Sequence, residues 1–209
     1  MLKLYYAPGA CSMASHMALE ESGLAYETQL VALAKGEQRS EAYRKINPRG
    51  RVPALQLDEH TVLTENAAIL TYIARQVPAK KLLPSEPLAE ARCLSLMAFL
   101  ASSVHVAFAH IGRPERYASD PAMHANLKET GRNAFHDYLK EIDGLLQGRT
   151  WYADHFTVCD PYLMVFYLWG RRIELPVGAL KAYSAHAARM SERPAVQRAL
   201  GQEGVPLAA

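Results

Sequence analysis

Residues 2–23 read LKLYYAPGACSMASHMALEESG, and this stretch decides how the first part of the chain folds. Residues 2–6 alternate in the manner of a short strand with one buried face. Pro8 and Gly9 then break the strand, and from Cys11 onward the composition is that of a helix ending near Gly23. Cys11 therefore stands where a strand leads into a helix.

A cysteine in this position is a candidate nucleophile. The first amide N–H groups of a helix lack intrahelical partners, and the helix dipole favours negative charge there. We therefore expect the pKa of the Cys11 thiol to be lowered, which would supply the reactive thiolate. The alternative is that Cys11 is a small buried hydrophobic residue, as free cysteines often are.

The composition is ordinary for a globular protein. Of the 209 residues, 50% are hydrophobic and 21% are charged, and the net charge is +2. Lysines and arginines are scattered, and the pairs Lys80-Lys81 and Arg171-Arg172 are interpreted as solvated. We therefore expect no nucleic-acid partner and no membrane partner.

The sequence indicates neither export nor a metal centre. Met1 leads almost directly into a strand, and the longest aromatic and aliphatic run, 162–169, is too short to span a bilayer. The three cysteines form no C-x-x-C pair, and the eight histidines form no H-x-x-x-H pair. A cytoplasmic protein without a metal site is predicted.

Further strands extend the first one into a sheet. Residues 26–31 alternate again, so strand, helix and strand form a βαβ unit with two parallel strands. After a short helix at 41–45, strands at 54–57 and 62–64 form an antiparallel hairpin.

Pro53 enters the first hairpin strand, where proline is tolerated, and we expect a cis Val52-Pro53 bond. Val52 would then turn its backbone N–H and C=O outward, toward an extended peptide-like ligand.

Glu65 and Asn66 precede a helix that ends at Pro78. A carboxylate at a helix start can bind an ammonium group, while the exposed N–H groups can bind a carboxylate. Both halves of an α-amino acid would be recognised at this point. The alternative is that one of the two residues simply caps the helix.

A proline-rich linker at 79–87 separates this region from a part that is helical throughout. Helices are expected at 88–111, 123–146, 157–172, 178–191 and 194–200. They should form an all-α bundle. Thr157 and Asp160 form a capping box before the apolar run of the third helix, and we assign them a structural role.

In this order and at these separations, the motifs YYAPGACSMASH, NPRGRVPAL, LTENAAI, SSVH and FTVCDPYL resemble the bacterial beta class of cytosolic glutathione transferases over essentially the whole chain. The resemblance implies an α/β plus all-α fold. A thioredoxin-like glutathione-binding domain would span 1–78, a linker 79–87, and a helical domain contributing the acceptor site 88–209.

The resemblance also implies roles for individual residues. Cys11 would lie against the glutathione sulfur and be able to form a mixed disulfide with it, and His105 would hydrogen-bond near that thiol. Residues expected to bind glutathione are Leu33, Lys35, Arg51, Val52, Pro53, Glu65, Asn66, Ser102 and Ser103. The two serines could act from a neighbouring subunit. Trp169 would lie on the wall of the acceptor site.

Some positions depart from the pattern of the class. Asn66 replaces a frequent serine, and Ala98 and Val106 replace an asparagine and a lysine, which is expected to weaken glutathione binding. Met97, Phe99 and Phe108 are assigned to core and interface packing rather than to the acceptor site. His110, Cys93 and Cys159 are interpreted as structural.

The leading hypothesis is a homodimeric glutathione transferase that uses glutathione as co-substrate and needs no other cofactor. It would transfer glutathione to electrophiles or exchange it with disulfides, and Ala14 in place of a second cysteine leaves only a monothiol route. The alternative is a non-enzymatic interaction or ligand-binding protein of the same fold.

Overall fold

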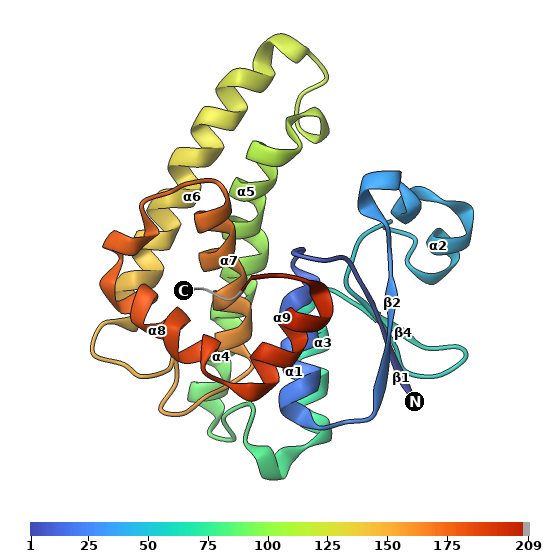
Figure 1. Cartoon of the computed structure of the whole chain (residues 1–209), viewed down its shortest axis with the longest axis vertical. Helices are drawn as coiled ribbons and strands as arrows, with labels where there is room; N and C mark the ends of the chain where they lie inside the picture. Colours follow the sequence, from blue (N-terminus) through green and yellow to red (C-terminus); the bar gives the residue numbers. More distant parts are fainter. Residues whose placement is uncertain (207–209) are drawn as a thin grey trace.

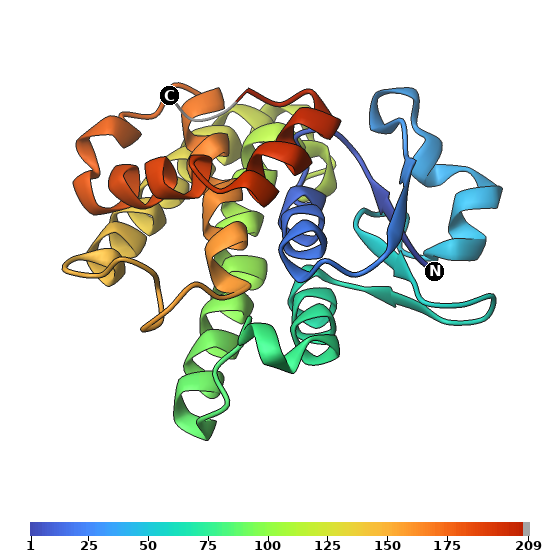
Figure 2. The same cartoon turned by 60° about the horizontal axis from the view of Figure 1, so that its bottom comes forward.

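The structure is a computed structural model that describes residues 1–206 (Figures 1 and 2). Its single sheet has the strand order β2-β1-β3-β4. Strand β1 (Leu2–Tyr6) runs parallel to β2 (Tyr26–Leu30) and antiparallel to β3 (Ala54–Gln56), which pairs antiparallel with β4 (Val62–Thr64). The predicted βαβ unit and the hairpin are both confirmed.

The two faces of the sheet carry different layers. Helices α1 (Ser12–Ser22) and α3 (Asn66–Gln76) lie between the sheet and the helical half, and Leu4 of β1 packs into this larger core (Figure 1). Its neighbour Tyr5 points to the opposite face, where it packs on Tyr43 of α2 (Glu41–Ile46). This alternation is the strand period read from residues 2–6.

From Pro87 to Glu203 the regular structure is helical, as predicted. Its helices are α4 (Pro87–Phe99), α5 (His105–Gly112), α6 (His124–Leu146), α7 (Cys159–Arg172), α8 (Lys181–Ser191) and α9 (Pro194–Glu203). One turn of π-helix, Leu100–Val104, joins α4 to α5, where the sequence predicts one uninterrupted helix. Short 3-10 turns lie at Leu33–Lys35, Glu37–Arg39, Pro78–Lys80, Pro114–Arg116, Pro121–Met123 and Val177–Ala179.

The larger of two hydrophobic clusters runs through both halves. Met13 and Met17 of α1 belong to the same buried cluster as Phe166 of α7 and Val196 of α9. Helix α9 returns across the molecule to pack on α1 (Figures 1 and 2). The halves are therefore packed against one another, which fixes the space between them.

Ion pairs support the α1–α9 contact. Arg193 binds Glu21 through two nitrogens at 2.6 and 2.9 Å, and Arg198 binds Glu20 at 2.7 Å. The Arg193 guanidinium also lies over the ring of Phe156, which adds a cation–π contact.

In a capping box, the Asp160 carboxylate would accept the Thr157 N–H and the Thr157 hydroxyl would accept the Asp160 N–H. The structure has the first of these bonds and replaces the second. The Asp160 carboxylate accepts the Thr157 N–H at 2.8 Å, but the Thr157 hydroxyl accepts from the Cys159 N–H rather than from Asp160. Asp160 also accepts the Tyr152 N–H and binds His186 Nε2, with both side chains fully buried. The box is thus the centre of a buried polar network.

The helical stretch Pro87–Gly112 is long and apolar enough to cross a membrane by length and composition. It is longer than residues 162–169, which were predicted from the sequence to be the longest apolar run. Core helices of soluble proteins pass the same test, but here only 28% of the most apolar window is buried, and Leu88 and Leu94 are 57% and 41% exposed. This stretch therefore presents an apolar face beyond the core.

Candidate active site

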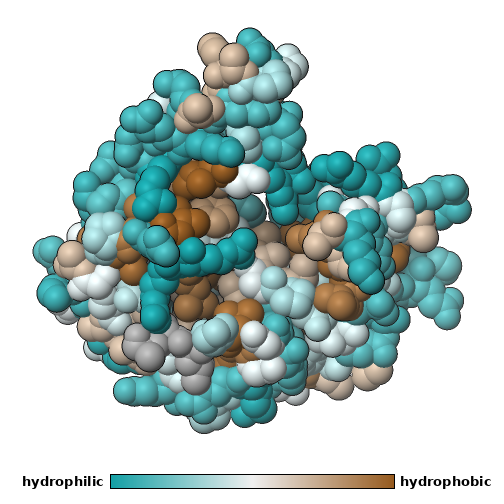
Figure 3. Space-filling view, turned by 45° about the horizontal axis from the view of Figure 1, so that its top comes forward, coloured by the Kyte–Doolittle hydropathy of each residue, from teal (hydrophilic) through white to brown (hydrophobic). Residues whose placement is uncertain are grey.

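A cleft of about 570 Å³ lies between the sheet and the helical half. Its lining comes from the loop after β1, the segments at 30–34 and 50–53, the start of α3, and helices α5 and α7. Figure 3 shows the hollow, with hydrophobic residues gathered inside it and hydrophilic residues around its rim. The predicted site residues Cys11, Leu33, Arg51, Val52, Pro53, Glu65, Asn66, His105 and Trp169 all line it.

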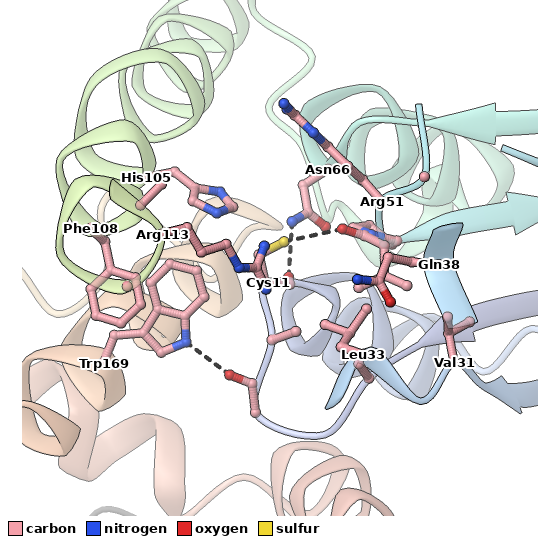
Figure 4. A pocket seen from close by; sticks show the side chains of 18 of the residues that line it. Cys11, Val31, Leu33, Gln38, Arg51, Asn66, His105, Phe108, Arg113 and Trp169 are labelled. Carbon is pink, nitrogen blue, oxygen red and sulfur yellow. Dashed lines mark hydrogen bonds between the residues drawn. The ribbon is translucent and has the colours of Figure 1, made fainter. Parts of the chain in front are cut away.

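Cys11 lies at the floor of the cleft as the N-cap of α1, with 8% of its surface exposed. Its thiol donates a hydrogen bond to the Val52 carbonyl, with Sγ and O 3.4 Å apart (Figure 4). Burial raises the pKa of the Cys11 thiol to about 12, although Arg113 and Arg51 act in the opposite direction. The expectation of a lowered pKa was therefore wrong, because desolvation exceeds the helix-start effect.

The loop that carries Cys11 is held from several directions. Trp169 Nε1 donates to the Gly9 carbonyl at 2.9 Å, and the Gly9 N–H donates to Glu203 of α9 at 3.1 Å (Figure 4). Glu203 in turn binds His16 Nδ1 at 2.9 Å, both side chains being fully buried. The loop is thus fixed by α1, α7 and α9 together.

The Val52-Pro53 bond is cis, as predicted. The segment before it is anchored at the Arg51 carbonyl, which accepts hydrogen bonds from the Tyr43 hydroxyl and from Asn47 Nδ2 at 2.8 and 2.7 Å. This anchoring holds the Val52 carbonyl beside Cys11, within hydrogen-bond distance of its thiol.

Glu65 and Asn66 have different roles, which the sequence does not distinguish. Asn66 is buried, accepts from Ser15 Oγ at 2.7 Å and donates to the Cys11 carbonyl at 2.9 Å, so its side chain braces the Cys11 loop. Glu65 is exposed, makes no side-chain capping bond to α3, and has a φ of 72°. A residue whose backbone is strained and whose carboxylate does not cap its own helix is typical of a ligand-binding position.

His105 faces the cleft from the first turn of α5, and no hydrogen bond joins it to Cys11 within residues 1–206. Its ring packs edge-on against Trp169, with centroids 5.0 Å apart, and against Phe166. Burial, followed by the charges of Arg113, Arg51 and Arg116, lowers the pKa of His105 to about 4. The imidazole is therefore neutral at physiological pH.

The structure does not bring every predicted residue to the cleft. Lys35 is exposed outside the lining, which leaves Arg51 as the cation on this side of the site. Ser102 and Ser103 lie in the π-helical turn, where Ser102 is exposed and neither lines the cleft.

Several lining residues were not predicted from the sequence: Gln38, Phe108, Arg113, Arg116 and Arg172. Phe108 was assigned to packing, but it stacks on Trp169 in the cleft wall at 4.2 Å between centroids. Arg172 belongs to a pair interpreted as solvated. Gln38 Oε1 is buried and has no hydrogen-bond partner within the described part of the chain.

His, Cys, Asp and Glu side chains do not gather in groups of three or more suited to a metal ion within residues 1–206. Cys93 and Cys159 are free and buried in the helical half, and Cys159 Sγ contacts the Cys93 carbonyl at 3.6 Å. This buried placement agrees with the interpretation of both cysteines as structural residues.

The sheet topology, the cis proline and the cysteine at the start of α1 define a thioredoxin-like unit joined to a helical bundle. Comparison with known proteins narrows this class. The family model described as "Glutathione S-transferase, N-terminal domain" matches residues 9–76. Glutathione S-transferase GstA from Escherichia coli O157:H7 is 35% identical over 207 residues, which cover 98% of this chain and 100% of that protein.

Solved structures give the same result. A glutathione transferase homologue from Sulfitobacter, solved with bound glutathione, superposes with a TM-score of 0.93 at 33% identity and covers 99% of both chains. A beta-class glutathione S-transferase from Sphingomonas chungbukensis has a TM-score of 0.86 at 37% identity, covering 98% of this chain and 100% of its own. The chain belongs to the glutathione S-transferase family, and the predictions of fold class and of glutathione transferase function are confirmed.

Proposed function

We propose that this protein conjugates glutathione to small electrophiles, with Cys11 acting as a hydrogen-bond donor to the glutathione thiolate. The observation that carries the proposal is the buried Cys11 thiol, which donates a hydrogen bond to the neighbouring Val52 carbonyl in the cleft. Burial raises the pKa of this thiol to about 12, which keeps it protonated. A thiol held in its neutral form can donate its hydrogen to a neighbouring anion, whereas a thiolate cannot.

Glutathione would lie extended along the Val52 backbone, with its thiol over Cys11. Glu65 would bind the γ-glutamyl ammonium group, and the N–H groups at the start of α3 would bind its carboxylate. Arg51 would bind the glycyl carboxylate, with Leu33 nearby. The buried Gln38 Oε1 would accept a hydrogen bond from a peptide N–H of glutathione.

The reaction then follows from these positions. Glutathione loses its thiol proton to solvent, and the thiolate is stabilised by the Cys11 S–H and the positive charge of Arg113. The sulfur forms a bond to the electrophilic carbon, and the leaving group departs with its electron pair. Neutral His105 packs beside the reacting groups on the acceptor side, with Trp169 behind it.

Thiol–disulfide exchange is the second candidate activity. Cys11 would attack a disulfide, and glutathione would release it from the mixed disulfide. This route needs the Cys11 thiolate, which burial disfavours in the unliganded cleft. We therefore place conjugation first. Family membership and the intact cleft do not favour the non-enzymatic alternative.

Further predictions extend this function. Residues 1–78 would form the glutathione-binding domain and 88–209 the acceptor domain, since the cleft takes its lining from both parts. Two copies would pair as a homodimer, which the exposed Leu88 and Leu94 of α4 support. Ser102 and Ser103 would then act across the dimer, and a cytoplasmic location remains a prediction.

The test compares wild type with Cys11→Ala in two assays. In the first, conjugation of a chlorodinitrobenzene is followed across pH with saturating glutathione. Losing the donor should raise the pKa of bound glutathione and lower the rate at neutral pH by about tenfold to a hundredfold. In the second, the intact mass is measured after incubation with oxidised glutathione, with and without reductant.

We expect wild type to form one reversible glutathione adduct, slowly, at a rate rising about tenfold per pH unit above neutrality because the thiolate is the minor form. Cys11→Ala should form none. Equal conjugation rates in the two proteins would overturn the donor role. Absence of conjugation, together with absence of glutathione binding by calorimetry, would overturn the enzymatic function.

A further inference from the structure

Three arginines from the helical half line the cleft without an acidic partner. Arg113 follows the end of α5, Arg116 ends the next 3-10 turn, and Arg172 ends α7. None of them takes part in a salt bridge within residues 1–206, whereas Arg75, Arg193 and Arg198 elsewhere on the surface all do. Other arginines without a salt bridge, such as Arg44 and Arg92, lie outside the cleft, so these three are distinguished by lining it together.

These guanidinium groups act on one another and on the centre of the site. Arg113 acts electrostatically on both Cys11 and His105. Burial and then the charges of Arg113, Arg51 and Arg39 lower the pKa of Arg116, and only Glu115 opposes them. Arg172 Nη1 lies 3.8 Å from the position of a Cβ at Gly9, so its charge reaches the Cys11 loop.

The charges of the cleft do not balance once glutathione is placed. Glu65 is the one carboxylate among the described side chains of the lining, and it serves the glutathione ammonium group in the proposed function. Arg51 serves the glycyl carboxylate. Arg116 and Arg172 remain without an assigned anion, and Arg113, whose charge also acts on the thiolate, lies with them on the side away from the sheet, where the second substrate would enter.

An aromatic wall lies on the same side. Phe108 and Trp169 stack with ring planes 22° apart, and Figure 4 shows both next to Arg113 and across the cleft from Arg51. Aromatic faces bind a planar ring, and guanidinium groups bind a carboxylate through paired hydrogen bonds. A single molecule with a planar ring and a carboxylate would contact both the aromatic wall and the guanidinium groups.

We propose that the acceptor substrate is an aromatic electrophile that carries a carboxylate, its ring against Phe108 and Trp169 and its anionic group at Arg113 and Arg116. This inference rests on the proposed function and names the substrate class of the same cleft. Arg172 adds positive charge at the entrance beside Gly9.

The experiment uses a matched pair of acceptors, a chlorodinitrobenzoate and its methyl ester, which differ only in charge. For each, kcat/KM is divided by the rate constant of the uncatalysed reaction with glutathione, which removes the difference in ring reactivity. Wild type should prefer the carboxylate by roughly tenfold, since one exposed charge-assisted hydrogen bond changes an affinity by about this factor.

Arg116→Gln should lower this preference toward unity while turnover of the ester is retained. Arg113→Gln should lower the preference as well, together with the rate for the ester, because Arg113 also acts on the thiolate. Arg44→Gln is the matched control, because Arg44 is exposed on α2 outside the cleft. Calorimetry of unreactive dinitrobenzoate, with S-methylglutathione present, should show the same loss of affinity in the cleft variants without any turnover.

Turnover of the ester with no preference for the carboxylate would overturn this inference alone. A preference that both cleft variants retain would overturn the assignment to these arginines. Failure to turn over either acceptor would overturn the proposed function as well, so the two results are distinguishable.

Discussion

The indole N–H of Trp169 donates to the backbone carbonyl of Gly9 over 2.9 Å, which connects α7 to the loop that carries Cys11. The same indole ring forms the wall of the cleft with Phe108. One side chain thus positions the Cys11 loop and forms part of the cleft wall.

Trp169→Phe separates these two roles, because it keeps an aromatic ring and removes the donor. We expect the free energy of unfolding to fall by about 1 kcal/mol, with a severalfold lower kcat/KM for conjugation. Urea unfolding and steady-state kinetics measure the two effects. Trp151→Phe, at a ring that packs on Phe156 outside the cleft, is the control and should leave kcat/KM unchanged.

Glu65 is a position where stability and binding are expected to oppose one another. Its φ of 72° is unfavourable for any residue with a side chain. Glu65→Gly should therefore raise the free energy of unfolding by about 1 kcal/mol while weakening glutathione binding about tenfold. Glu65→Gln should weaken binding alone. Calorimetric glutathione titration unaffected by either change would refute the ammonium contact.

His105 should make the protein less stable in acid. Its pKa in the folded protein, about 4, lies below the unfolded value of about 6.5, so the unfolded chain binds more protons between these pH values. The stabilisation from burying the neutral ring is complete above about pH 6.5 and is lost as pH falls through 4.

Urea unfolding of wild type and His105→Gln across this range measures the effect. Between about pH 6.5 and pH 4, the free energy of unfolding of wild type should fall by up to about 3 kcal/mol more than that of the variant. Parallel pH profiles for the two proteins would show that His105 does not stay neutral in the folded state.

Asp160 should matter for folding and not for binding. Its buried carboxylate accepts the Thr157 and Tyr152 N–H groups and binds His186. Asp160→Ala leaves these groups unpaired inside the core, and a loss of about 3 to 5 kcal/mol of unfolding free energy is expected.

The folded fraction of Asp160→Ala should bind glutathione normally by calorimetry, because Asp160 does not line the cleft. Asp120→Ala is the control. It removes an exposed cap whose carboxylate accepts the Ala122 N–H, and it should lower the free energy of unfolding by only about 1 kcal/mol. Loss of glutathione affinity in folded Asp160→Ala would contradict a purely structural role.

Much of the fold could be predicted because its signals are local. Alternation in residues 2–6, the left-handed glycine at Gly23 and the proline at Pro53 each act over a few positions, and each is found where expected. The π-helical turn at Leu100–Val104 has no such local signal, since the flanking residues have the composition of a continuous helix.

The electrostatics of the site could not be predicted in this way. The pKa of Cys11 depends on how deeply the loop after β1 is covered by distant helices, and burial exceeds the helix-start effect. Arg113, Arg116 and Arg172 are unremarkable in a chain of net charge +2. Only the packing of α5 against α7 brings their charges to one cleft.

The bond between the Gly9 N–H and Glu203 joins residues 194 positions apart. During synthesis on the ribosome, the Cys11 loop emerges long before the helix that holds it. The sheet and α1 can form early, but the reactive centre reaches its final geometry only after α9 has been made and has folded back. Premature termination before α9 would therefore release a chain with its fold largely specified and its active site unfinished.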